Sequence, residues 1–201
     1  MPPHQLPLAT CHLSLILASR SPRRRELLAE AGYQFEVVPP SCAEENMPDH
    51  AESPADYVAR LARAKAADVV RQMGRGVVLG CDTVAVCKGQ ILGKPESAEA
   101  ARRMLELLSG REHRVLTGIC VWSAPAGEPL TRVALTTLRM DRLSTEQLAE
   151  YVSSRQWEGK AGGFGYQDRL GWVHIVEGSP SNVVGLPLEL LAEMLKQVCA
   201  G

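Results

Sequence analysis

The sequence predicts an α/β fold built around a mixed β-sheet with helices on its faces. Segments with the 3.6-residue helical period alternate with short apolar strands along the chain, which is typical of sheets that contain parallel pairs. Turn residues at Lys88-Gly89 and within 125–129 join successive strands directly, and such hairpins are antiparallel. The sheet is therefore expected to be mixed, and 201 residues, 45% of them hydrophobic, are enough to bury its core.

The elements follow from capping residues and from apolar periodicity. Ser21 is a suitable N-cap for a helix with Pro22 at its first position, and Gly32 ends that helix. A longer helix begins at Ser53-Pro54 and ends before Gly74. The other predicted helices are 97–108, 145–154 and 187–198. The predicted strands are short apolar runs bounded by turn residues, at 13–18, 34–38, 77–80, 84–87, 90–92, 115–122, 132–140 and 172–176.

Composition and charge argue against several classes of protein. A formal net charge of −1 disfavours a general nucleic-acid binder, because such proteins carry a basic excess that neutralises many phosphates. No apolar run approaches the roughly 20 residues that span a bilayer, and residues 1–12, a flexible leader, lack the basic start of a signal peptide. The six cysteines form no CxxC pair and are expected to be reduced. We expect a cytoplasmic protein without membrane contact, folded as a single domain over residues 13–201.

The segment Ser19-Arg20-Ser21-Pro22-Arg23-Arg24-Arg25 concentrates cations in the first turn of a predicted helix. Helix N-termini carry partial positive charge, so stacked arginines there cost stability unless an anion occupies the site. Free backbone N–H groups, serine hydroxyls and guanidinium groups would all point at a phosphate. The alternative is that some of these arginines are solvated or pair with Glu26 and Glu30.

Asp82 directly follows a predicted buried strand and precedes Thr83. Open α/β sheets bind ligands at the carboxyl ends of their strands, so a carboxylate there is well placed to deprotonate a water or to hold a divalent ion. An aspartate that only caps the end of a strand is the alternative.

Two lysines and an acidic pair extend this chemistry. Lys65 falls on the apolar stripe of the second helix, where it either reaches past the core edge to water or meets phosphates. Lys94 precedes a helix start and is either a phosphate contact or an ordinary exposed lysine. Glu44-Glu45 is either a solvated pair or a source of carboxylate oxygens for a hard cation.

The glycine-rich loop 160–167 begins at Lys160 and ends at Gln167. Its glycines allow the backbone to approach a flat ligand closely, and an amide such as that of Gln167 can read the edge of a base. The loop lacks the Gly-Lys-Ser/Thr ending of a phosphate loop, which disfavours a kinase or GTPase. His113 is expected to be a surface or hydrogen-bonded structural residue rather than a phosphate contact.

Six segments in order resemble the Maf family, and they span nearly the whole chain. Each segment alone is only suggestive, but the ordered set is highly specific. They are Ala18-Ser19-Arg20-Ser21-Pro22-Arg23-Arg24, Gly80-Cys81-Asp82-Thr83, Gly93-Lys94-Pro95, Leu108-Ser109-Gly110-Arg111-Glu112-His113, Lys160-Ala161-Gly162-Gly163-Phe164-Gly165-Tyr166-Gln167 and Val184-Gly185-Leu186-Pro187.

The resemblance implies an elongated Maf/ITPase-like α/β fold, with a bent mixed sheet and a nucleotide in the cleft between two lobes. It implies a homodimer and a hydrolase that cuts nucleoside triphosphates to monophosphate and pyrophosphate with Mg²⁺ or Mn²⁺. Asp82 matches the proton acceptor and, with Glu44, the metal site. The positions that match substrate contacts are Ser19, Ser21, Arg23, Arg24, Lys65, Thr83, Lys94, Lys160 and Gln167.

Branches of the family differ at three positions associated with base choice, and here these are Arg23, Thr83 and Gln167. This combination resembles the dTTP/UTP branch, whose members prevent misincorporation of unwanted nucleotides. The 7-methyl-GTP branch, which tends to carry Trp, Gln and Glu at these positions, is the alternative substrate class. A nucleotide-binding regulator of cell division is the alternative outside catalysis, and it would need the nucleotide site but not Asp82.

Overall fold

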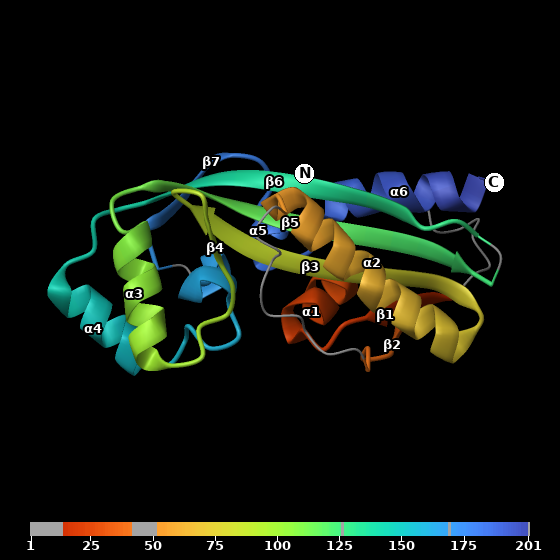
Figure 1. The fold of residues 1–201 in the computed structure, drawn as a ribbon, viewed down its shortest axis with the longest axis horizontal. Coiled ribbons are helices and arrows are strands. Elements are labelled where there is room, and N and C mark those ends of the chain that lie inside the picture. The colour runs from red at the N-terminus through yellow and green to blue at the C-terminus, as the bar shows by residue number, and fades with distance from the viewer. Residues whose placement is uncertain (1–13, 42–51, 126, 169, 201) are drawn as a thin grey trace. The chain divides into compact units, whose positions relative to one another are not determined.

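The computed structural model describes residues 14–41, 52–125, 127–168 and 170–200 (Figure 1). The strands are β1 (Leu15–Ala18), β2 (Phe35–Val37), β3 (Gly76–Cys87), β4 (Gln90–Leu92), β5 (Glu112–Ala124), β6 (Leu130–Met140) and β7 (Val173–Glu177). The helices are α1 (Pro22–Glu30), α2 (Pro54–Met73), α3 (Ala98–Leu108), α4 (Thr145–Ser153), α5 (Pro180–Val184) and α6 (Leu188–Ala200). Two short 3₁₀ turns, η1 (Ala161–Gly163) and η2 (Tyr166–Asp168), lie between α4 and β7.

All seven strands belong to one mixed sheet. Six strands follow the order β2-β1-β3-β5-β6-β7, and β4 pairs with β3 off this path. Strand β1 runs parallel to β2 and to β3, whereas β4 is antiparallel to β3 and β7 is antiparallel to β6. The predicted α/β fold with a mixed sheet and flanking helices is therefore confirmed.

The predicted helix starts are confirmed by serine caps. The hydroxyl oxygens of Ser21, Ser53, Ser97 and Ser144 each accept a hydrogen bond from the backbone N–H three residues later. Each cap satisfies one of the N–H groups that the first turn of a helix leaves without a partner, which stabilises the helix by about 1 kcal/mol. These caps fix where α1, α2, α3 and α4 begin.

Strand β3 differs from its prediction. The sequence suggested two strands separated by the polar Asp82-Thr83, but one continuous strand runs from Gly76 to Cys87. Asp82 therefore lies inside the strand rather than at its carboxyl end, and that part of the prediction is wrong. The polar residues do not break the strand, because the Asp82 side chain pairs with a buried lysine. The five-residue helix α5 was also missed, since it is too short to show a period.

The chain divides into two compact units. The first unit comprises residues 1–82, 117–134 and 185–201, and the second comprises 83–116 and 135–184. Strands β3, β5 and β6 contribute residues to both units. The predicted boundary between a leader and a single domain falls at residues 12 and 13, outside the described residues, and it stays a prediction.

The core of the first unit has two layers, because its strands alternate their side chains between two helical covers. The odd-numbered residues of β1 and β3, such as Leu17 and Leu79, pack with Leu28 of α1 and Met194 of α6. The even-numbered residues, such as Ile16 and Val78, pack with Ala62, Ala66 and Val69 of α2. In Figure 1, α2 (gold) runs along β3. The even-numbered residues of β3 from Val78 to Asp82 therefore face α2.

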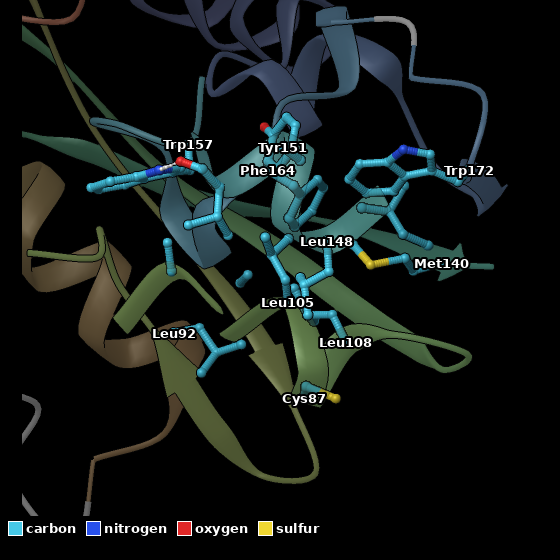
Figure 2. Packing of buried hydrophobic residues seen from close by; sticks show 14 of the residues in the cluster. Cys87, Leu92, Leu105, Leu108, Met140, Leu148, Tyr151, Trp157, Phe164 and Trp172 are labelled. Carbon is cyan, nitrogen blue, oxygen red and sulfur yellow. Dashed lines mark hydrogen bonds between the residues drawn. The ribbon is translucent and has the colours of Figure 1, made fainter. Parts of the chain in front are cut away.

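The second unit has its own hydrophobic cluster (Figure 2). Helices α3 and α4 lie side by side and contribute Leu105 and Leu148 to it. The ring of Tyr151 meets that of Trp172 edge to face, with ring centroids 5.4 Å apart. Phe164, from the glycine-rich loop, is also buried in this cluster. The loop is thus anchored to the core of its unit.

In the described parts of the chain, no helix is both long and apolar enough to cross a membrane.

Candidate functional site

A buried ion pair joins α2 to β3 in the first unit. The ammonium nitrogen of Lys65 lies 2.6 Å from Oδ1 of Asp82, and the two side chains are 8% and 15% exposed. The apolar stripe of α2 predicted that Lys65 would face inward, and this is confirmed. The structure thus places together two residues that the sequence singled out separately.

Gly80 explains how Lys65 reaches Asp82. Both Gly80 and Asp82 lie on the face of β3 that packs against α2. A Cβ atom on Gly80 would lie only 2.2 Å from the carbonyl oxygen of Ala62 and 2.8 Å from the backbone nitrogen of Ala66. Because Gly80 has no side chain, the backbone of α2 can lie close against β3 at Ala66, the residue that follows Lys65. Gly118 on β5 allows the same approach, since a Cβ there would lie 2.2 Å from the carbonyl oxygen of Val58.

Arg24 is held inside the first unit by two other segments. Its Nε donates to the carbonyl oxygen of Gly185 at 2.8 Å, and its Nη1 donates to the hydroxyl of Ser19 at 3.2 Å. The Ser19 hydroxyl also accepts from the backbone N–H of Ser21 at 3.1 Å. Ser19, Ser21 and Arg24 therefore form one connected network. The sequence indicated these three residues, but it gave no sign that the Gly185 carbonyl would position the guanidinium.

The neighbouring arginines differ in exposure. Arg24 is buried, Arg23 is half-buried and Arg25 is exposed. The predicted cluster in the first turn of α1 thus separates into an inner arginine, an intermediate one and an outer one. Arg25 fits the solvated alternative that the sequence left open.

Three charged groups of the first unit, Arg24, Lys65 and Asp82, act electrostatically on the thiol of Cys81. Burial raises the pKa of the Cys81 thiol to about 11, and the positive charges of Arg24 and Lys65 partly oppose this rise. Asp82 acts in the same direction as burial. All three charges therefore lie within electrostatic reach of the same point on β3. Two cations with one carboxylate leave this region with a positive balance that suits a polyanionic ligand.

The remaining substrate-binding candidates lie in the second unit. Thr83 is half-buried on β3, whereas Lys94 and Gln167 are exposed. Lys160 is paired: its ammonium group hydrogen-bonds to Oδ2 of Asp168, and the two side chains are 12% and 14% exposed. The sequence indicated no role for Asp168, because a pair eight residues apart in an irregular loop has no recognisable period.

His113 is buried in the second unit, so of the two settings expected for it, the structural one is found. Its ring meets that of Phe164 edge to face at 5.2 Å between centroids, and Nδ1 lies 3.5 Å from the carbonyl oxygen of Arg111. Within the described residues, Nε2 has no hydrogen-bond partner. Burial lowers the pKa of His113 to about 4, and the contact with Arg111 opposes this only in part.

Acid is therefore expected to destabilise the protein through His113. The folded-state pKa of about 4 lies below the ordinary value of 6.5, so the unfolded chain binds the extra proton between these values. The stabilisation is complete above pH 6.5 and is lost as the pH falls toward 4. Urea unfolding at pH 7.5 and at pH 4.5 gives the free energy of unfolding under each condition. Between these two pH values, the free energy of unfolding of the native protein should fall by about 2–3 kcal/mol more than that of His113→Phe.

The exposed His174 provides the control for this measurement. Its Nε2 lies 2.8 Å from Asp141, and its side chain is 45% exposed. The variant His174→Gln should keep most of the acid sensitivity of the native protein. If His113→Phe lost stability with acid as steeply as the native protein, the buried histidine would not be its source.

A divalent cation would find few protein ligands among the described residues. No group of three or more His, Cys, Asp or Glu side chains that could hold a metal occurs among residues 14–41, 52–125, 127–168 and 170–200. Of the two expected ligands, Asp82 is described and Glu44 lies outside the described residues. One or two carboxylates together with phosphate oxygens are, however, the usual surroundings of Mg²⁺ on a nucleotide. Asp82 can supply one carboxylate to a set of this kind.

Comparisons with known proteins identify the family of this chain. The family model described as Maf-like protein matches residues 14–198. A dTTP/UTP pyrophosphatase from Rhodopirellula baltica is 51% identical over 184 residues, which cover 91% of this chain and 81% of that protein. A dTTP/UTP pyrophosphatase from Moorella thermoacetica is 45% identical over 182 residues, which cover 90% of this chain and 93% of that protein.

Two solved structures share the fold at low sequence identity. A HAM1 protein from Coxiella burnetii has a TM-score of 0.53 at 18% identity, covering 92% of this chain and 99% of that chain. The Staphylococcus aureus Ham1 protein has a TM-score of 0.51 at 13% identity, and the match covers 92% of this chain and 98% of that chain. The fold is thus shared beyond the close relatives. With the family model spanning nearly the whole described chain and relatives at up to 51% identity, this chain belongs to the Maf family.

Proposed function

We propose that this chain hydrolyses dTTP and UTP to the nucleoside monophosphate and pyrophosphate. The observation that carries the proposal is the buried pair of Lys65 and Asp82, which places a carboxylate within a region of positive balance. Relatives at 51% and 45% identity carry the name dTTP/UTP pyrophosphatase, which supports the same reaction. Such an enzyme removes nucleotides that would otherwise be misincorporated.

Two cationic side chains of the first unit, Lys65 and Arg24, are proposed to bind the phosphates of the nucleotide. Lys65 supplies a compact positive charge, and Arg24 supplies a guanidinium that Ser19 and Gly185 already hold in place. A positioned cation that meets charge developing in the transition state needs no reorganisation during the reaction. The Ser19–Ser21 network at the start of α1 adds hydroxyl groups beside the helix N-terminus.

Asp82 is proposed to accept the proton of the attacking water. The oxygen of that water forms a bond to the α-phosphorus, the bridging bond from the α-phosphorus breaks, and pyrophosphate leaves. The contact with Lys65 through Oδ1 fixes the orientation of the carboxylate. A base held in one orientation satisfies the geometric requirement for proton transfer.

A divalent cation is proposed as the cofactor, with Mg²⁺ or Mn²⁺ as the candidates. Asp82 and Glu44 would supply its protein ligands, with phosphate oxygens completing the set. When bound, the cation withdraws charge from the phosphate group that is attacked and from the pyrophosphate that leaves.

Base choice is proposed to depend on Arg23, Thr83 and Gln167, of which Gln167 is exposed at the turn η2. An amide side chain offers both donors and an acceptor to the edge of a pyrimidine. We further propose that the protein works in the cytoplasm as a homodimer and does not bind nucleic acid.

Pyrophosphate release tests the proposed function. Purified protein with Mg²⁺ or Mn²⁺ is given dTTP, UTP, CTP, 7-methyl-GTP, ATP and GTP, and both products are identified. We expect kcat/KM for dTTP and UTP to exceed that for the other nucleotides by at least about 10-fold, a ratio within reach of hydrogen-bonded base selection. A preference for 7-methyl-GTP would refute the base assignment, and binding without turnover would favour a regulator.

A further inference from the structure

A largely buried three-residue cluster closes the glycine-rich loop of the second unit. Lys160 and Asp168, at the two ends of residues 160–168, meet through the lysine ammonium group and Oδ2 of the carboxylate. The hydroxyl of Tyr151 donates a hydrogen bond to the same oxygen at 3.1 Å. We call Lys160, Asp168 and Tyr151 the loop clasp.

The loop clasp lies directly over the backbone of Gly165. A Cβ atom on this glycine would lie 2.5 Å from Oδ2 of Asp168 and 2.6 Å from the ammonium nitrogen of Lys160. Two backbone hydrogen bonds compact the same segment, from Gly163 N–H to the Lys160 carbonyl at 3.0 Å and from Asp168 N–H to the Gly165 carbonyl at 3.3 Å. The ion pair therefore packs against a folded loop rather than bridging a loose one.

Tyr151 connects the clasp to the core. It belongs to α4, and its ring packs edge to face on Trp172 in the hydrophobic cluster (Figure 2). Its side chain is buried, with only 5% exposure. The carboxylate of Asp168 is thus held by one residue of the loop and by one residue of the rigid interior.

The residue beside this anchored carboxylate is Gln167, which is exposed. We infer that Asp168 is a positioning residue, which holds the 160–168 loop so that Gln167 presents its amide to the base. This inference rests on the proposed function, in which Gln167 contributes to base choice. Isolated buried ion pairs are weak sources of stability, because desolvation offsets much of their attraction. Fixing the orientation of the loop is therefore the more specific role for this pair.

The substitution Asp168→Asn tests the inference while preserving shape. The amide oxygen of the asparagine can still accept a hydrogen bond from Tyr151. The substitution removes the negative charge that pairs with Lys160. We expect KM for UTP to rise about 10-fold, with kcat changed less than about 3-fold, because a displaced positioning group weakens binding before chemistry. The preference for UTP over CTP, measured as the ratio of kcat/KM values, should fall about 10-fold.

The substitution Glu158→Gln is the matched control. It breaks another ion pair at the edge of the same loop, between Arg155 and Glu158 at 2.6 Å, but these side chains are 76% and 46% exposed. Exposed pairs contribute little, so KM, kcat and nucleotide preference should stay at native values. Circular dichroism of both variants verifies that they are folded.

Amide hydrogen exchange provides a readout that does not need turnover. Residues 161–168 should exchange about 10-fold faster in Asp168→Asn than in the native protein, whereas α3 should not change. Native exchange in this loop, or a uniform loss of activity on all nucleotides with preference retained, would overturn the inference. A native protein that released no pyrophosphate from any nucleotide would instead overturn the proposed function, and the exchange rates would still decide whether Asp168 holds the loop.

Discussion

Replacing Asp82 by asparagine is expected to lower kcat for UTP by at least about 10²-fold, because an amide cannot accept the proton of the attacking water. The substitution preserves shape, and the amide oxygen can still accept a hydrogen bond from Lys65. Nucleotide binding should therefore survive. Steady-state pyrophosphate release gives kcat, and calorimetric titration with UTP gives the dissociation constant.

The loss of charge at position 82 also has a structural cost, which must be separated from the chemical one. Lys65 is buried, so removing its carboxylate partner leaves a cation with poor solvation. A clear fall in melting temperature is therefore expected alongside the loss of turnover. Thermal unfolding measured under the assay conditions distinguishes an unfolded variant from an inactive one.

Asp141→Asn is the matched control for Asp82→Asn. Asp141 also makes an ion pair, with His174 at 2.8 Å, but its side chain is 47% exposed. This variant should retain native kcat and KM. If Asp82→Asn kept more than a tenth of the native kcat while remaining folded, the proposed role of Asp82 as proton acceptor would be wrong.

Local signals made much of the fold predictable. Ser21 predicts the N-cap of α1, and Ser53-Pro54 predicts the start of α2, because the N-terminal N–H groups of a helix need partners that a nearby serine supplies. Helical periodicity also placed Lys65 on the inner face of α2. Both signals operate within a few residues along the chain, so they can be read from a single sequence.

Contacts between distant residues were not predictable in the same way. The predicted interruption of β3 at Asp82 was wrong. Lys65 on α2, seventeen residues earlier in the sequence, supplies the partner that the Asp82 carboxylate needs inside a sheet. The Gly185 carbonyl that holds Arg24 is separated from it by 161 residues. Residue types indicated that Arg24 and Asp82 carry chemistry, but only the fold identifies what orients them.

Gly80→Ala is expected to be among the most destabilising small substitutions in the first unit. The added methyl group would lie 2.2 Å from the carbonyl oxygen of Ala62 and 2.8 Å from the backbone nitrogen of Ala66. Both atoms belong to the backbone of α2, so no side chain can rotate away and the helix itself must move. Overpacking of this kind costs about 3 kcal/mol, which corresponds to a melting temperature lower by about 10 °C for a chain of this size.

Displacement of α2 should also impair catalysis, because Lys65 follows the helix while Asp82 stays on β3. Gly80→Ala should therefore lower kcat as well as the melting temperature, although residue 80 carries no functional group. Gly93→Ala is the control for stability: a methyl group there meets nothing within 4 Å, so the melting temperature should change by less than about 3 °C. Equal melting temperatures for the two variants would show that α2 can move away from β3 at little cost. The close approach of α2 at Gly80 would then be refuted as the cause of the contact between Lys65 and Asp82.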